Sequence, residues 1–144
     1  MNRRAAALCL LFVLGAAVVA RAQEVELEEV LNRLGTAWEH GDAGALAALA
    51  AHAGLSIEIL GERVGPLSKR QVAAVLRRVF ERRETIALRH GMAQVVGGTP
   101  PRAFGELAWI TRVEGTTIPE RATIFIALIR EDEGWRVTQI RLLR

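Results

Sequence analysis

The sequence predicts an α+β domain in which N-terminal helices pack on a strongly curved, mostly antiparallel sheet. Apolar residues recur with a helical period in most of residues 24–83 and with a period of two from residue 85 onward. Short turns separate the later strand-like segments, which indicates antiparallel neighbours. The chain has 144 residues, of which 51% are hydrophobic and 24% charged. At roughly 100–200 residues per domain, one globular domain is expected.

Residues 1–22 have the pattern of a secretory signal peptide. Arg3-Arg4 forms a basic start, residues 5–20 are uncharged and largely apolar, and Ala20-Arg21-Ala22 places small residues where a signal peptidase reads them. The alternative is a membrane anchor, but the run is shorter than the roughly 20 apolar residues that span a bilayer. We therefore expect cleavage after Ala22, export to the periplasm or beyond, and a mature domain over 23–144 with no membrane span.

Cleavage would change the charge of the chain. Three of the 19 basic side chains (Arg3, Arg4 and Arg21) lie in the leader, which leaves 16 basic against 16 acidic side chains. The excess positive charge thus belongs to the leader, and no nucleic-acid partner is expected. Cys9 would leave as well, which excludes disulfides, cysteine metal ligands and cysteine nucleophiles from the mature chain.

Two helices are expected before the first strand, over 55–59, and a third helix between that strand and the others. Residues 24–40 carry one apolar stripe, and four glutamates crowd its start, where the helix dipole favours anions. Asp42 is predicted to cap a short helix over 43–53. Ser68 and Gln71 form a capping box for a helix over 69–83. That helix carries an arginine-rich face, which either contacts anionic lipid or polysaccharide or is simply solvated.

Strands are predicted over 55–59, 85–96, 103–113, 119–130 and 135–143, with a turn region over 61–66. The strand over 119–130 is apolar on both faces, with Ile124 and Ile126 on one and Phe125 and Ile129 on the other. Helices can cover one face of the sheet. A second copy of the chain is the expected cover for the other, which predicts a homodimer packed through the sheets. The alternative is that strand bending turns both faces partly inward.

Four stretches resemble the nuclear transport factor two-like superfamily. They are the helix–Gly-Asp-Ala–helix start from Trp38 to Leu49, segments 55–61 and 68–72, and the ending 135–142, which opens with Trp135. The order of elements is similar to that of this cone-shaped fold over most of residues 24–144, closest to small secreted bacterial members of unknown function. The resemblance implies a curved sheet around the long helix, a pocket inside the cone and frequent homodimers. It implies no activity, because the fold hosts unrelated functions.

The enzymes of this superfamily can be tested against the residues present. Ketosteroid-isomerase-like and scytalone-dehydratase-like chemistry both depend on tyrosine, and this chain has none. Asp42 and Asp132 are assigned to a helix cap and a turn, so no Ser-His-Asp triad is expected either. His40, His52 and His90 lie on different elements, which predicts no metal site. No cofactor is expected.

The candidate acid–base residues are His90 and Glu58. Histidine is a common general acid or base in catalysis, and Glu58 could point into the cone as the partner of His90. A buried hydrogen-bonded histidine and a solvent-facing glutamate are the alternatives. The first hypothesis is thus a non-catalytic module that binds a small apolar or amphipathic ligand or acts as an accessory interaction domain. The second is a small lyase or isomerase that uses His90 and Glu58.

The candidate ligand-contacting residues of the cone are Trp38, His90, Trp109 and Gln139. Arg89 and Arg141, together with Gln139, could line a pocket for an anionic ligand, although exposed sheet positions explain them equally well. Glu106 and Arg112 share a strand face and could form a buried ion pair or a surface pair.

Overall fold

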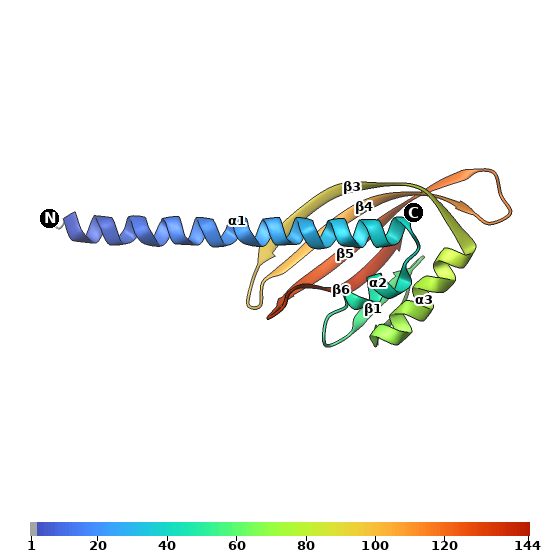
Figure 1. Cartoon of the computed structure of the whole chain (residues 1–144), viewed down its shortest axis with the longest axis horizontal. Coiled ribbons are helices and arrows are strands. Elements are labelled where there is room, and N and C mark those ends of the chain that lie inside the picture. Colours follow the sequence, from blue (N-terminus) through green and yellow to red (C-terminus); the bar gives the residue numbers. More distant parts are fainter. Residues whose placement is uncertain (1–2) are drawn as a thin grey trace.

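The structure, a computed structural model, describes residues 3–144, with side chains from Gly15 onward. Its helices are α1 (Arg3–Glu39), α2 (Ala43–Ala48) and α3 (Lys69–Arg82). Its strands are β1 (Leu55–Ile59), β2 (Glu62–Leu67), β3 (Arg83–Gly97), β4 (Arg102–Val113), β5 (Pro119–Glu131) and β6 (Gly134–Leu143). Figure 1 shows the strands curving past the helices, with the start of α1 projecting beyond the sheet. The α+β class and the N-terminal position of the helices are confirmed.

The strands form one sheet in the order β2-β1-β6-β5-β4-β3. Only the β1–β6 pair is parallel, and the other four pairs are antiparallel. Directly opposed residues share a face of a sheet. The face toward the helices, here called the inner face, carries Leu107, Trp109 and Ile124, all buried. The opposite or outer face carries Phe104, Ile110 and Phe125, which are partly exposed.

The core lies between α1 and the inner face. The predicted stripe of α1 is buried in full: Leu27, Val30, Leu31, Leu34 and Trp38. The indole of Trp38 meets the rings of Phe80 and Trp109 edge-on, at centroid distances of 5.2 and 5.4 Å. A β-carbon on Gly105 would lie 2.8 Å from the methyl groups of Leu31, so the absence of a side chain there lets α1 approach β4.

The first helix is longer than predicted. It runs without a break from Arg3 to Glu39, rather than over 24–40, so the clustered glutamates lie mid-helix and do not face the dipole of its first turn. The side chains of Arg3, Arg4 and Cys9, which enter the leader prediction, lie outside the described residues. No helix in the described part of the chain is long and apolar enough to cross a membrane.

Two further boundaries differ from the sequence predictions. The second helix ends at Ala48 instead of 53, because the backbone from Leu49 to Ala51 hydrogen-bonds to Val137 of β6. The expected turn over 61–66 is strand β2, which pairs with β1 through a turn at Leu60 and Gly61, both with positive φ. Nearly all of β2 is exposed, so its sequence has no alternating pattern to reveal it.

The predicted caps are confirmed. The Asp42 carboxylate accepts a hydrogen bond from the Ala45 amide at 2.9 Å. The Gln71 side chain accepts from the Ser68 amide at 2.9 Å, which with the reciprocal Ser68 contact completes the capping box of α3. The box fixes where α3 begins, opposite β1 and β2, and so fixes the wall of the cavity described below.

Candidate ligand-binding cone

A cavity of about 730 Å³ opens between α3 and the inner face of the sheet. Its apolar walls come from five strands and the helix: Ile57, Ile59, Val64, Val75, Val79, Trp109, Ala122 and Leu142. Strand alternation aims these sheet residues inward, since Ile57 lies opposite Val64 on β2 and Ile140 on β6, and Ala122 lies opposite Trp109. The helix supplies Val75 and Val79, one turn apart. The result is a hollow with an apolar interior.

Trp109 is the aromatic residue of this cavity wall. Its side chain is buried, and its indole Nε1 donates to the hydroxyl of Thr85 at 2.9 Å. The hydrogen bond satisfies the one polar atom of the ring, so the buried ring leaves no unpaired polar atom behind the cavity wall.

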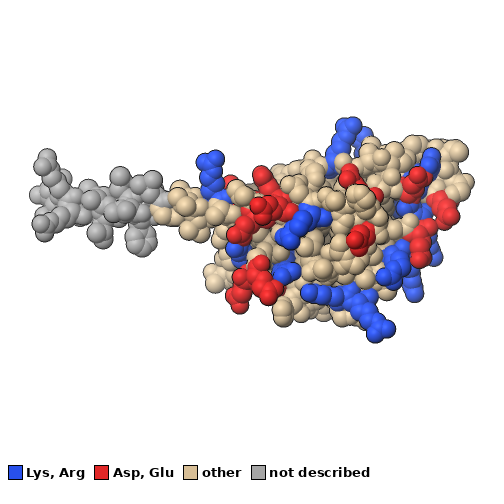
Figure 2. All heavy atoms as spheres, in the orientation of Figure 1, with Lys and Arg blue, Asp and Glu red and all other residues tan. Residues whose placement is uncertain are grey.

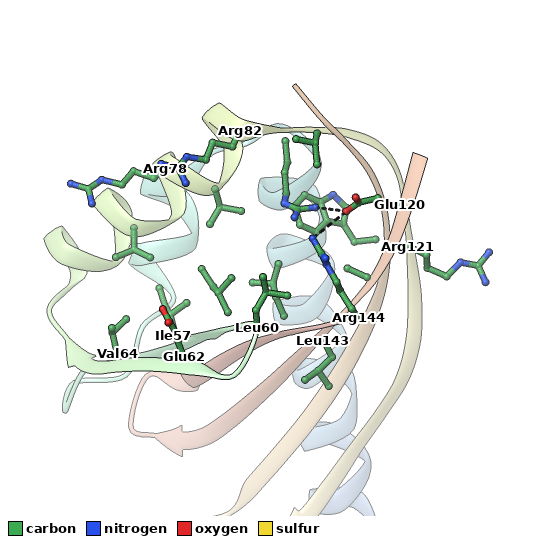
Figure 3. Close-up of a pocket in the computed structure, with 18 residues that line it drawn as sticks. Ile57, Leu60, Glu62, Val64, Arg78, Arg82, Glu120, Arg121, Leu143 and Arg144 are labelled. Atoms are coloured by element: carbon green, nitrogen blue, oxygen red, sulfur yellow. Dashed lines mark hydrogen bonds and ion pairs between the residues drawn. The ribbon is translucent and has the colours of Figure 1, made fainter. Parts of the chain in front are cut away.

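Charged side chains stand at one end of the cavity (Figure 3). The guanidinium groups of Arg83 and Arg144 both contact the carboxylate oxygen Oε2 of Glu120, at N···O distances of 3.1 and 3.5 Å. Glu120 lies opposite Thr111 on the inner face, two residues along β5 from Ala122 and therefore about 7 Å from it. Arg83 begins β3, Glu120 is in β5 and Arg144 follows β6, so the three charges come from distant parts of the chain. We call Arg83, Glu120 and Arg144 the mouth triad.

Other arginines near the mouth point elsewhere. Arg121 lies opposite Ile110 on the outer face, and Figure 3 shows it directed away from the cavity. Arg78 and Arg82 also border the cavity, but their side chains extend along α3, away from Glu120. Over the whole face seen in Figure 2, acidic and basic side chains are interspersed. The mouth triad is therefore where positive charge converges on the cavity.

Glu58 does not point into the cone. It lies on the outer face, where its carboxylate accepts hydrogen bonds from Arg63 of β2 and Arg141 of β6 at 3.0–3.2 Å. Only 8% of the residue is exposed. The hydrogen bond from Arg63, with that from Arg141, lowers the pKa of Glu58 although burial acts to raise it. The carboxylate is thus held ionised by two guanidinium groups.

His90 lies far from Glu58. It is on β3, and strands β6, β5 and β4 separate β3 from β1, which makes four interstrand spacings of about 4.8 Å each. The ring is exposed rather than buried in the core as one alternative had it, and it faces Gly35 of α1. It borders a smaller hollow of about 210 Å³ with Glu28 and Asn32. The structure does not bring the two candidate acid–base residues together.

The other predicted residues are distributed as follows. Trp109 lines the cavity, whereas Trp38 lies behind it in the core, with its Nε1 unpartnered among the described residues. Gln139 is on the outer face, opposite Ser56 and Ala127. Arg89 and Arg141 share that face, opposite Ala108 and Phe125, so the anion pocket expected from these three residues is not inside the cone. Alternation counted within one strand cannot tell which face the helices cover.

The expected pair of Glu106 and Arg112 does not form. Arg112 contacts Glu84 on the neighbouring strand β3 instead, because residues directly across a strand pair lie closer than residues six apart along one strand. His40 and His52 lie near the ends of the first two helices, and His52 contacts Glu131. Across the residues described, no three histidine, cysteine, aspartate or glutamate side chains are grouped as a metal site.

The sequence predictions missed the mouth triad. A signal for Glu120 existed, since it shares the alternation of Ala122 and Ile124, which were assigned to one face. Arg83 falls within the predicted helix over 69–83, and Arg144 lies one residue beyond the predicted strand over 135–143. Neither position belonged to a predicted strand, so no alternation could be applied to them.

No family model and no curated protein sequence matches this chain. Solved structures do. A protein from Novosphingobium aromaticivorans described as nuclear transport factor two-like with a cystatin-like fold is 20% identical, covers 90% of this chain and 86% of its own, and superposes with a TM-score of 0.64. The chain has the nuclear transport factor two-like fold.

Two more structures carry the same fold. A ketosteroid isomerase-like protein from Erwinia carotovora atroseptica is 19% identical, with 83% and 94% of the two chains covered and a TM-score of 0.66. A Catenulispora acidiphila protein with a ketosteroid isomerase-like fold, in complex with trimethylamine, is 17% identical, with 81% and 85% covered and a TM-score of 0.64. Identities this low establish the nuclear transport factor two-like fold alone.

Proposed function

We propose that this chain is a ligand-binding module whose cone takes up the apolar body of a small amphipathic molecule. The observation that carries the proposal is the cavity of about 730 Å³ with apolar walls and charged residues at one end. Small-molecule sites have volumes of about 300–1,000 Å³ and are mostly apolar with few polar groups. The complex of the Catenulispora protein with trimethylamine supports small-molecule binding by proteins of this fold.

The module is proposed to be non-catalytic. The lyase or isomerase alternative needs a base and its partner within hydrogen-bond reach of one substrate. Glu58 is engaged by two arginines on the outer face, and His90 is on the far edge strand. At the cavity itself, the carboxylate of Glu120 is also paired with two arginines.

Export after cleavage at Ala22 is part of the proposal. Side chains of residues 15–22 are all exposed, and burial begins at Gln23. The indole of Trp135 donates to the Gln23 carbonyl at 3.0 Å. Loss of the first 22 residues would therefore remove none of the described packing, which supports a folded mature chain that starts at Gln23.

A homodimer through the outer face is also proposed. Phe104 and Phe125 stack there with ring centroids 5.8 Å apart, and Ile110 and Ile129 lie farther along the same face. A wholly solvent-facing sheet surface is normally polar, and adjacent apolar side chains on it favour a protein partner. The two-fold symmetry of a dimer would pair this face with itself.

Binding in the cone can be tested with N-phenyl-1-naphthylamine, an uncharged apolar probe that becomes fluorescent out of water. The wild-type chain is expected to bind it, and Val79→Trp to abolish binding by filling the cavity. Ala74→Trp is the matched control, because Ala74 is exposed on the same helix and does not line the cavity. Absence of binding by the wild type, or equal loss in both variants, would contradict the proposal.

A further inference from the structure

The mouth triad has the composition of an anion site that is filled by the chain's own carboxylate. Two guanidinium groups meet one carboxylate, so the triad has one positive charge in excess. Both arginines approach the same oxygen of Glu120, Oε2, at 3.1 and 3.5 Å. Arginine binds carboxylates and other oxyanions through pairs of parallel N–H groups, and neither arginine uses two nitrogens here. The pair therefore has donors left for a second anion.

The three side chains differ in how firmly they are held. Arg83 is 20% exposed, Glu120 41% and Arg144 56%. Arg83 thus forms the more buried side of the triad, whereas Glu120 and Arg144 can move toward solvent. A carboxylate at a half-exposed ion pair is held weakly, because water screens such pairs. An incoming anion can therefore displace Glu120 without breaking up the core.

The triad stands directly beside the apolar interior. Glu120 is two residues along β5 from Ala122, which faces Trp109, and Arg144 follows strand β6, which supplies Leu142 to the cavity wall. A molecule with its apolar body against Trp109 and Leu142 would place its head at the triad. That head would stay near water, so little desolvation opposes its binding.

From this arrangement we propose that the cone is specific for a free amphipathic monocarboxylate, whose carboxylate takes the place of Glu120 between Arg83 and Arg144. This inference rests on the proposed ligand-binding function and names its ligand class. An uncharged ligand with the same apolar body gains nothing from the two arginines. A cationic ligand would meet the excess positive charge of the triad.

The test uses displacement of bound N-phenyl-1-naphthylamine by decanoate and by 1-decanol, which share a chain length and differ in the head. Glu120→Gln removes the competing charge, so we expect decanoate to bind about two- to fivefold more tightly and decanol to be unchanged. Arg144→Gln is expected to weaken the binding of decanoate by a similar factor and to leave the binding of decanol unchanged. Circular dichroism checks that each variant is folded.

Glu62→Gln is the matched control. It removes the same charge from an exposed residue of the cavity rim that makes no ion pair among the described residues. An equal gain for decanoate in both glutamine variants would reflect general electrostatics and overturn the inference. A loss in Glu120→Gln would also overturn it, because Glu120 would then be positioning the arginines. Failure of the naphthylamine probe itself to bind contradicts the proposed function instead.

Discussion

The indole of Trp135 donates a hydrogen bond to the backbone carbonyl of Gln23 at 3.0 Å, and so joins the start of β6 to the middle of α1. Arg130, whose guanidinium lies 5.7 Å from the centre of the Trp135 ring, also contacts Glu26 on the next turn of α1. These contacts mark where the long helix becomes part of the domain. Side chains of residues 15–22 stand clear of it.

Removal of residues 1–22 is therefore expected to leave the free energy of unfolding within about 0.5 kcal/mol of the full chain. The truncation keeps the Gln23 carbonyl and places Glu24 and Glu26 in the first turn of the helix, where its dipole favours carboxylates. Urea unfolding of chains 1–144 and 23–144 measures the difference.

A chain that starts at residue 28 is the control for this truncation. It loses the acceptor for Trp135, the Glu26–Arg130 pair and the buried Leu27, which is 2% exposed. Loss of one buried leucine alone costs about 2–5 kcal/mol, so we expect at least about 3 kcal/mol of destabilisation. A comparable loss in chain 23–144 would show that the segment before Gln23 belongs to the folded domain.

Glu58 and its two arginines predict an acid-dependent contribution to stability. Because these contacts lower the pKa of Glu58 in the folded state, their contribution is complete above about pH 4.3, the usual value for an unfolded glutamate. It is lost as the pH falls through the lowered pKa. Glu58→Gln should thus destabilise the chain at pH 7 and have a smaller effect at pH 3.

Glu62→Gln provides the comparison in the same hairpin. Glu62 is exposed and pairs with Ile59 across the β1–β2 turn, with no arginine partner among the described side chains. Urea unfolding of both variants from pH 7 to pH 3 separates the two cases. Equal, pH-independent effects would mean that Arg63 and Arg141 do not stabilise the ionised form of Glu58.

Local patterns were sufficient for most of the fold. The capping box at Ser68 and Gln71 and the two apolar faces of β5 are short-range features, and the structure bears them out. The curved sheet around the long helix was predicted from the resemblance to the nuclear transport factor two-like superfamily. Strand β2 was missed because it is exposed and contains Gly65 and Pro66, which are typical of turns.

The candidate site was harder to predict because it depends on how distant strands align. Trp109 lines the cavity, whereas Glu58 and Gln139 lie on the outer face. The parallel pairing of β1 with β6 places both of these side chains on that face. Alternation within one strand gives two faces without saying which is inner. Arg83 and Arg144 meet at Glu120 only through the register of β3, β4, β5 and β6.

The apolar residues of the outer face lead to a prediction about dimerisation. If Phe104 and Phe125 lie at the centre of a homodimer, Phe125→Arg places a charge opposite its own copy and removes an aromatic anchor. The dissociation constant of the dimer should rise at least about 30-fold, as measured by analytical ultracentrifugation of chain 23–144. Ile118→Arg is the control, because Ile118 is 74% exposed and precedes β5 in the loop after β4. A wild-type chain that stays monomeric at high micromolar concentration, or a Phe125→Arg dimer as tight as the wild type, would show that this face is not the interface.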